Sequence, residues 1–173
     1  MTTERERCVT GTPGTIAPPA PSIALFQPDI AGNTGTILRL GACLDLGVEI
    51  IGPAGFDLSD RALRRAGMDY LAMSRLTRHI DLAAFDAARQ DAGRRLVLLT
   101  TKADRIYTDF VFQPDDILLF GRESAGVPEH VHAAADARLT IPMQPAARSL
   151  NLATAVAMVA GEALRQLRWS KAG

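Results

Sequence analysis

The stretch SIALFQPDIAGNTGTILRLGACLDLGVEIIG, residues 22–52, decides the fold class. Its first six residues form a short apolar run that is typical of a strand, and the Pro-, Gly- and Asn-rich residues 28–35 predict a loop. Apolar residues then recur at helical spacing through 36–47, and residues 48–52 predict a second strand, which Pro53 ends. Strand, helix and strand in about thirty residues form a βαβ unit, and such units build parallel sheets.

The rest of the chain continues this alternation. The further elements that we predict are helices with loops over 57–92, buried strands at 95–101, 116–121 and 137–143, and a final helix over 151–169. The order predicts a single α/β domain over residues 22–170, with a mostly parallel sheet flanked by helices. Residues 1–21 are rich in Pro, Gly and Thr, and we expect them to be a disordered tail.

Composition excludes several classes of protein. With 173 residues, 47% of them hydrophobic, the chain is long enough for a packed core but has no apolar run of membrane-spanning length. Its 19 basic and 19 acidic residues balance, so bulk charge argues neither for nor against a nucleic-acid partner. The cysteines Cys8 and Cys43 form neither a disulfide framework nor a metal-binding spacing with the three histidines. We expect no secretory signal, no metal and a cytoplasmic location.

Three of the predicted strands run into polar loops that contain Gly or Pro. These loops are TTKADR, GRESAGVP and PMQPAARS. Ligands of open parallel sheets bind at the carboxyl ends of the strands, so three such loops favour a binding site over plain turns. The phosphate-loop pattern GxxxxGK[ST] and the dinucleotide pattern GxGxxG are both absent, which disfavours an ordinary nucleotide-binding enzyme.

The loop before the first helix contains residues that commonly cap a helix, and it is followed by an arginine at an unusual position. Asn33 or Thr34 could cap the helix. Arg39 is expected near the first helical turn, where the helix dipole opposes a positive charge, and a nearby anion would relieve that repulsion.

The other two loops allow structural and functional interpretations. Gly121 and Gly126 permit close approach of a ligand to the backbone, and Glu123 between them could accept hydrogen bonds from a ribose or from the backbone. A glycine-rich turn with an exposed Glu explains the same residues. In RSLNL, residues 148–152, Ser149 or Asn151 can cap the final helix, yet only one cap is needed and Arg148 is present as well.

Taken together, the patterns PxIxxNxGxIxR, FGxExxGxP and IPMxxxxRSLNL resemble the SPOUT class of RNA methyltransferases. The similarity is greatest to the small single-domain branch that 2′-O-methylates the wobble nucleotide of tRNA, cytidine or modified uridine. It extends from about Ile23 to Gln166 and includes RRAGMDY and TRH between the three motifs.

The resemblance implies a trefoil-knotted C-terminal segment, a homodimer, and S-adenosylmethionine as the methyl donor, with S-adenosylhomocysteine as product. It implies tRNA as partner, and neither DNA nor a membrane. The implied donor pocket consists of Leu99, Gly121, Ile141 and Ser149. The implied catalytic set consists of Asn33, Arg39, Glu123, Ser149 and Asn151. Arg148 is also assigned to the RNA-facing side.

The RNA surface is expected to include the arginines of RALRR, because they lie three to four residues apart on a predicted helix. These are Arg61, Arg64 and Arg65, joined by Arg75, Arg78 and His79. A solvated helix face is the alternative interpretation of the same charges.

Two positions depart from the family pattern. Gly161 stands where the family often has a Tyr, and Arg122 where a small residue or Pro is common. The alternative functions are a non-catalytic RNA-binding protein of the same fold and a methyltransferase that acts on ribosomal RNA. Helix-spaced small residues at 153, 157, 160 and 161 allow a second helix to approach, or they pack against the protein's own sheet.

Overall fold

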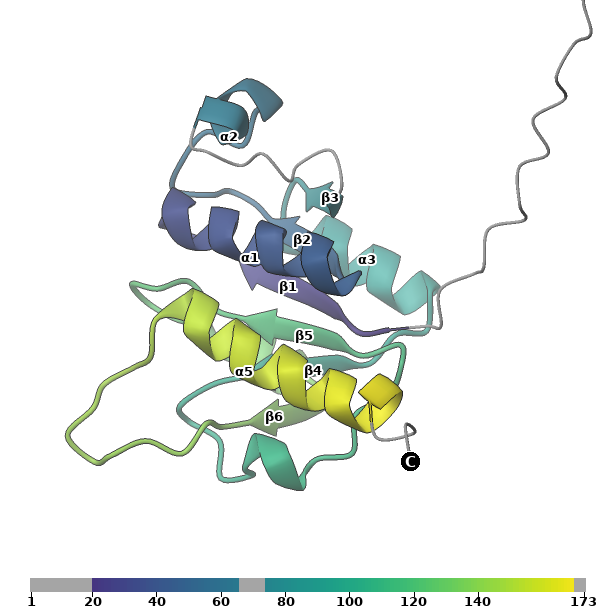
Figure 1. The fold of residues 1–173 in the computed structure, drawn as a ribbon, viewed down its shortest axis with the longest axis vertical. Coiled ribbons are helices and arrows are strands. Elements are labelled where there is room, and N and C mark those ends of the chain that lie inside the picture. The colour runs from purple at the N-terminus through teal and green to yellow at the C-terminus, as the bar shows by residue number, and fades with distance from the viewer. Residues whose placement is uncertain (1–19, 66–73, 170–173) are drawn as a thin grey trace, which may run out of the picture.

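A six-stranded, wholly parallel sheet forms the centre of the molecule in the computed structural model, which describes residues 20–65 and 74–169 (Figure 1). The strands lie in the order β3-β2-β1-β5-β4-β6. The expected βαβ unit is present as β1 (Ser22–Phe26), α1 (Ala31–Leu44) and β2 (Gly47–Ile51), with Ile23 opposite Val48. The prediction of an α/β domain with a mostly parallel sheet is confirmed.

The later elements follow the predicted order with two additions, a strand at 75–79 and a short helix at 129–134. They are α2 (Asp60–Arg65), β3 (Arg75–His79), α3 (Leu82–Asp91), β4 (Leu96–Leu99), β5 (Ile117–Phe120), α4 (Glu129–Ala134), β6 (Ala137–Leu139) and α5 (Leu152–Leu164). A π-helical turn at Arg165–Trp169 continues α5. The sequence predicts only helices and loops over 57–92, so β3 corrects that prediction. Its sequence RLTRH is polar because, within the described part of the chain, β3 lies at the edge of the sheet beside β2.

Helices cover both faces of the sheet (Figure 1). On one face α1 and α5 lie side by side, and their side chains Ile37, Leu38, Val156 and Val159 pack onto Leu118 and its neighbours. On the other face α3 and α4 contribute Phe85 and Val131, which pack against Leu98 and Leu119. Burial of β1 and β5 on both sides explains their continuous apolar sequences, since parallel strands sandwiched between helices lack a solvent face.

The start of α1 differs from the prediction. The helix begins at Ala31, not near Thr36, so Asn33 and Thr34 lie inside its first turn and Ile30 takes the cap position without a side-chain hydrogen bond. Arg39 is therefore eight residues beyond the first helical residue, about 12 Å along the axis. The argument that the helix dipole acts on Arg39 is wrong, because that effect fades within the first turn.

The segment between β6 and α5, residues 140–151, crosses the carboxyl edge of the sheet on its way to α5 (Figure 1). The trefoil knot that the family resemblance implies for the C-terminal segment stays a prediction. The boundary between a tail at 1–21 and a domain at 22–170 also stays a prediction, since residues 1–19 lie outside the described part. Among the described helices, none is both long and apolar enough to cross a membrane.

Candidate active site

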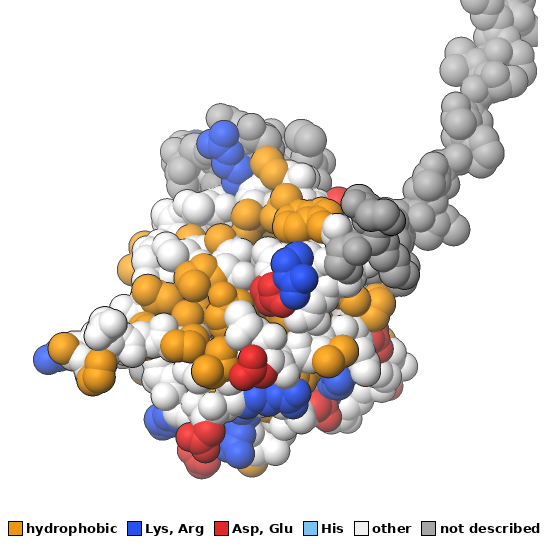
Figure 2. Space-filling view, turned by 60° about the horizontal axis from the view of Figure 1, so that its bottom comes forward, with side chains coloured by type: hydrophobic (Ala, Val, Ile, Leu, Met, Phe, Trp, Pro, Cys, Tyr) orange, Lys and Arg blue, Asp and Glu red, His pale blue; other side chains and the backbone are white. Residues whose placement is uncertain are grey.

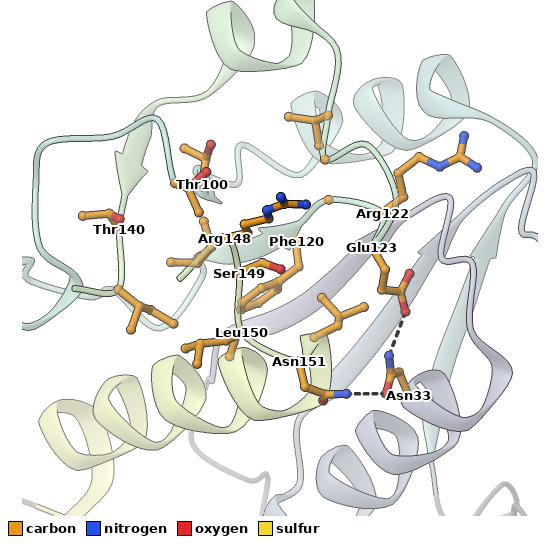
Figure 3. A pocket seen from close by; sticks show the side chains of 18 of the residues that line it. Asn33, Thr100, Phe120, Arg122, Glu123, Thr140, Arg148, Ser149, Leu150 and Asn151 are labelled. Carbon is orange, nitrogen blue, oxygen red and sulfur yellow. Dashed lines mark hydrogen bonds between the residues drawn. The ribbon is translucent and has the colours of Figure 1, made fainter. Parts of the chain in front are cut away.

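A cavity of about 440 Å³ opens at the carboxyl ends of β4, β5 and β6 (Figure 3). The three loops expected to meet at this edge all contribute to its wall. Leu99 comes from the end of β4, Gly121 from the end of β5, and Ile141 and Ser149 from the segment before α5. The structure thus brings together the four residues that the family resemblance assigned to a donor pocket.

The loop after β5 is closed on itself. The backbone N–H groups of Arg122 and Gly126 donate to each other's carbonyl oxygens at 3.1 and 2.8 Å. A Cβ atom on Gly121 would lie 2.6 Å from the carbonyl carbon of Gly126, so only glycine fits there. Gly126 itself has φ +67°, a backbone conformation that glycine adopts at low cost. The two glycines are required by the turn itself, so the structural interpretation accounts for them.

Three polar side chains from distant segments form a hydrogen-bonded chain at the mouth of the cavity (Figure 3). Nδ2 of Asn33 donates to Oε1 of Glu123 at 3.1 Å. Oδ1 of Asn33 in turn accepts from Nδ2 of Asn151 at 2.9 Å. The other oxygen of Glu123 accepts from the backbone N–H of Asp29 at 2.8 Å. Asn33, Glu123 and Asn151 therefore belong to one site, and the predicted backbone hydrogen bond of Glu123 is present.

The RSLNL motif performs the capping role and also lines the cavity. Oδ1 of Asn151 accepts from the backbone N–H of Thr154 at 3.2 Å, which makes Asn151 the N-cap of α5. Arg148 and Ser149 are exposed and extend over the cavity (Figure 3). Capping uses one side chain, so Arg148 and Ser149 remain available to a ligand.

A second polar cluster supports the loop that carries Glu123. The Asp29 carboxylate pairs with Nη2 of Arg122 at 2.6 Å and accepts from the backbone N–H and Oγ of Ser124 at 3.0 and 2.6 Å. The Arg122 hydrogen bond, followed by those of Ser124, holds the pKa of the Asp29 carboxyl well below its ordinary value. Arg122, which departs from the family pattern, thus has a specific partner.

Other residues expected at the site lie elsewhere. Arg39 is exposed in the middle of α1 and is not among the described residues that line the cavity. Arg61 and Arg78 are exposed on α2 and β3. The side chains of Arg64 and Arg65 lie outside the described part of the structure.

Two residues expected on the RNA surface have internal partners. Nε2 of His79 lies 3.0 Å from Oε2 of Glu49, its side chain is 10% exposed, and its ring meets Phe85 edge-on. Assigning His79 to the RNA surface is therefore wrong, because Glu49 and Phe85 enclose it. Arg75 pairs with Asp45 at 3.1 Å but keeps 57% of its side chain exposed.

Sequence reasoning missed Asp29 and Ile30 in the first loop and Thr100 and Thr140 at the strand ends. Ile30 is 50% exposed and lines the cavity, an unusual position for an isoleucine. The position of Thr100 directly after β4 was the available signal, whereas the role of Asp29 depends on contacts 93 residues away. Across residues 20–65 and 74–169, no cluster of three or more His, Cys, Asp or Glu side chains could hold a metal ion.

Comparison with known proteins agrees with this geometry. A profile of the SpoU rRNA methylase family matches residues 20–161. The chain belongs to the SpoU methylase family. A relative from Beijerinckia indica, named tRNA (cytidine(34)-2′-O)-methyltransferase, is 64% identical over 145 residues, which cover 84% of this chain and 91% of the relative.

Solved structures of family members share the fold. One, described as giving structural insights into the 2-OH methylation of C/U34 on tRNA, superposes with a TM-score of 0.81 at 40% identity, covering 87% of this chain and 98% of the other. An AdoMet-bound rRNA methyltransferase from Sinorhizobium meliloti superposes with a TM-score of 0.77 at 28% identity, covering 86% of this chain and 57% of the other.

Proposed function

We propose that this protein transfers a methyl group from S-adenosylmethionine to the ribose 2′-oxygen of nucleotide 34 of tRNA. The observation that carries the proposal is the Glu123–Asn33–Asn151 chain, which borders a cavity of ligand size in a chain 64% identical to a tRNA (cytidine(34)-2′-O)-methyltransferase. The lower identity to the Sinorhizobium rRNA methyltransferase makes ribosomal RNA the second candidate substrate.

The residues around the cavity fit the methyl donor. Its volume lies within the range of about 300–1,000 Å³ that is usual for small-molecule sites. Leu99, Ile141 and Leu152 supply apolar surface suited to a purine ring, while Ser149 supplies a hydroxyl. Glu123 also lines the cavity, and its carboxylate suits the positive charge of the sulfonium, which S-adenosylhomocysteine lacks. The bound donor supplies an activated methyl group.

The reaction requires alignment and the management of one proton. In the transfer, the ribose 2′-oxygen would form a bond to the methyl carbon as the carbon–sulfur bond breaks. The electron pair of that bond would stay on sulfur, and the hydroxyl proton would pass to solvent water. Positioning by Asn33, Glu123 and Asn151 supplies much of the rate, because aligned reactants avoid the entropic cost of encounter. Arg39 stays protonated, so its role is to stabilise the developing alkoxide and to hold the adjacent phosphate.

A homodimer would reconcile this role of Arg39 with its position outside the cavity of its own chain, because Arg39 would act at the site of the second copy. The surface of α5 supports a dimer. Ala153 and Ala160 are buried in the protein's own core, whereas Ala157 and Met158 are exposed. Figure 2 shows a face on which hydrophobic side chains gather into a broad patch.

The anticodon loop would approach across the mouth of the cavity. Arg148 stands over the cavity, and Arg61 and Arg78 are exposed cations on α2 and β3 that could bind phosphates farther along the RNA. Arg64 and Arg65 belong to the same proposed surface. We propose a cytoplasmic location, which a tRNA substrate supports.

The test is methyl transfer from radiolabelled S-adenosylmethionine to tRNA transcripts, followed by mass spectrometry of the digested product. We expect one methyl group on the ribose of nucleotide 34 and no transfer to a tRNA that has a 2′-deoxyribose at that position. Transfer to ribosomal RNA alone would support the second candidate. Binding of tRNA without any transfer would identify a non-catalytic RNA-binding protein.

A further inference from the structure

Asp29 contacts three consecutive residues of the loop that carries Glu123. Its carboxylate accepts from Arg122 on one side of Glu123 and from both the N–H and the hydroxyl of Ser124 on the other. Its backbone N–H donates to the carboxylate of Glu123 itself. Arg122 helps to line the cavity, but Figure 3 shows its guanidinium directed away from the centre, which agrees with a role in holding the loop.

Asp29 is itself held by the end of β2. The N–H of Gly55 donates to the carbonyl of Pro28 at 2.9 Å, and the N–H of Gln27 donates to the carbonyl of Ile51 at 2.8 Å. A Cβ atom on Gly55 would lie 3.1 Å from Cα of Asp29, so the two segments are in close contact. The Asp29 carboxylate thus links the β5–α4 loop to a segment that is fixed against the end of β2.

The side chain of Glu123 is held from the β1–α1 region. Its carboxylate accepts from the Asp29 N–H and from the Asn33 amide, and both residues belong to that region. Arg122 keeps 36% of its side chain exposed and Asp29 keeps 20%, so the pair is partly shielded from solvent. Charge-assisted hydrogen bonds of this kind are stronger than those between neutral groups.

We propose that Asp29 is a positioning residue for methyl transfer: through Arg122 and Ser124 it sets where Glu123 stands against Asn33. This inference rests on the proposed function. Loss of the Asp29 carboxylate leaves in place Leu99 and Ile141, the apolar wall proposed to bind the adenine of the donor. We therefore expect this loss to impair methyl transfer more than it impairs binding of the donor.

The test compares Asp29→Asn with wild type in three measurements. We expect kcat for tRNA methylation to fall about 10- to 100-fold, the loss typical of charge-assisted hydrogen bonds. Affinity for S-adenosylhomocysteine, measured by calorimetry, should change less than about threefold, because interactions that act only during reaction affect kcat selectively. The backbone amides of residues 122–126 should exchange with deuterium faster than in wild type. Asp29→Glu should recover part of kcat.

Asp57→Asn is the matched control. Asp57 also accepts from a nearby serine, from both the N–H and the hydroxyl of Ser59, but it lies in a surface loop away from the cavity. We expect its kcat and its exchange at residues 122–126 to match wild type. An unchanged kcat in Asp29→Asn, or an equal loss in Asp57→Asn, would overturn the proposal.

Two single-partner variants keep the proposal testable if Asp29→Asn fails to fold. Arg122→Gln and Ser124→Ala each remove part of the same cluster of hydrogen bonds, and each should lower kcat less than the loss of the carboxylate would. If neither lowers kcat, Asp29 is not a positioning residue. Absence of methyl transfer by wild type would instead refute the proposed function, while the exchange measurement would still report whether Asp29 holds the loop.

Discussion

Asn151 donates from its side-chain amide to that of Asn33 at 2.9 Å, although 118 residues separate them. The hydrogen bond joins the first turn of α1 to the N-cap of α5. Because Oδ1 of Asn151 is occupied by the Thr154 N–H, its Nδ2 faces Asn33, and Asn33 is thereby oriented with Nδ2 toward Glu123. One residue therefore stabilises a helix and orders the candidate site.

Substitution at Asn151 should separate these two roles. Asn151→Ala should destabilise the protein by about 1 kcal/mol, the usual cost of removing a cap, and should also lower kcat/KM. Asn151→Ser retains a capping oxygen but is too short to reach Asn33, so the melting temperature should stay near that of wild type while kcat/KM falls. Thermal unfolding and methylation kinetics measure both. A fully active Asn151→Ser protein would show that the hydrogen bond to Asn33 is dispensable.

Dimers of two different variants should reveal whether Arg39 acts at the site of its own subunit or at the site of the other subunit. Arg39→Ala and Ser149→Ala proteins are each expected to be nearly inactive as homodimers. A purified heterodimer of the two, selected with two affinity tags, contains one intact site if Arg39 acts across the dimer, so about half of wild-type activity should return.

The assay is tRNA methylation by the heterodimer, with the two homodimers as controls. If all three species are dimeric by light scattering and the heterodimer stays inactive, Arg39 does not act at the other subunit's site.

Gly121→Ala should disturb the loop after β5. The added Cβ would lie 2.6–3.0 Å from backbone atoms of Gly126, and relief of such overpacking usually costs about 1–3 kcal/mol. We expect a lower melting temperature, by about 2–4 °C for each kcal/mol, and weaker binding of S-adenosylhomocysteine.

Gly32→Ala is the control for this change, because nothing lies within 4 Å of its added Cβ and Gly32 is helical. Alanine should stabilise that position by up to about 1 kcal/mol. Equal stability of the Gly121→Ala and Gly32→Ala proteins would contradict the packing argument.

The Asp29–Arg122 pair should give stability a defined acid dependence. Arg122 and Ser124 lower the pKa of Asp29 in the folded protein below its ordinary value of 3.8. The resulting stabilisation is complete above the unfolded pKa and is lost as pH falls from 3.8 toward the folded pKa. Arg122→Gln should raise the pKa of Asp29 toward 3.8.

Carboxyl NMR titration and urea unfolding from acid to neutral pH measure these effects. The difference in free energy of unfolding between wild type and Arg122→Gln should stay constant at neutral pH and shrink in acid. High salt should reduce it, because both side chains are partly exposed. An identical Asp29 titration in the two proteins would rule out this account.

Arginines that bind RNA phosphates should govern the salt dependence of tRNA binding. Replacing Arg61 or Arg78 by alanine should reduce the slope of log K against log salt by up to about 1 for each phosphate that is no longer bound. Arg165 is the control because it is exposed on the π-helical turn after α5, outside α2 and β3, where it pairs with Glu162 at 2.8 Å. Fluorescence anisotropy with labelled tRNA at several salt concentrations measures the slopes. A larger effect for Arg165→Ala would place the RNA surface elsewhere.

Local sequence patterns were sufficient to predict most strands, because those strands are buried between helices. β1 and β5 are sandwiched between helices, so their sequences SIALF and ILLF are apolar without alternation. The edge strand β3 has the polar sequence RLTRH, and pairing with β2 provides hydrogen bonds that no local pattern encodes. The first turn of α1 was missed for a similar reason. Its Gly, Asn and Thr residues favour loops. The side chain of Asn33 donates to Glu123 and accepts from Asn151, and these hydrogen bonds oppose that tendency.

The sequence alone determined that this is a parallel α/β protein and predicted a ligand site at the carboxyl ends of the strands, because strand burial and the position of polar loops are local properties. Only the tertiary structure decided which of those polar residues meet. β1 pairs with β5, with Leu25 opposite Phe120, so the loops that follow them lie together and Asp29 reaches Arg122 and Ser124. That adjacency depends on the order of strands in the sheet, which arises from packing among segments far apart in the chain.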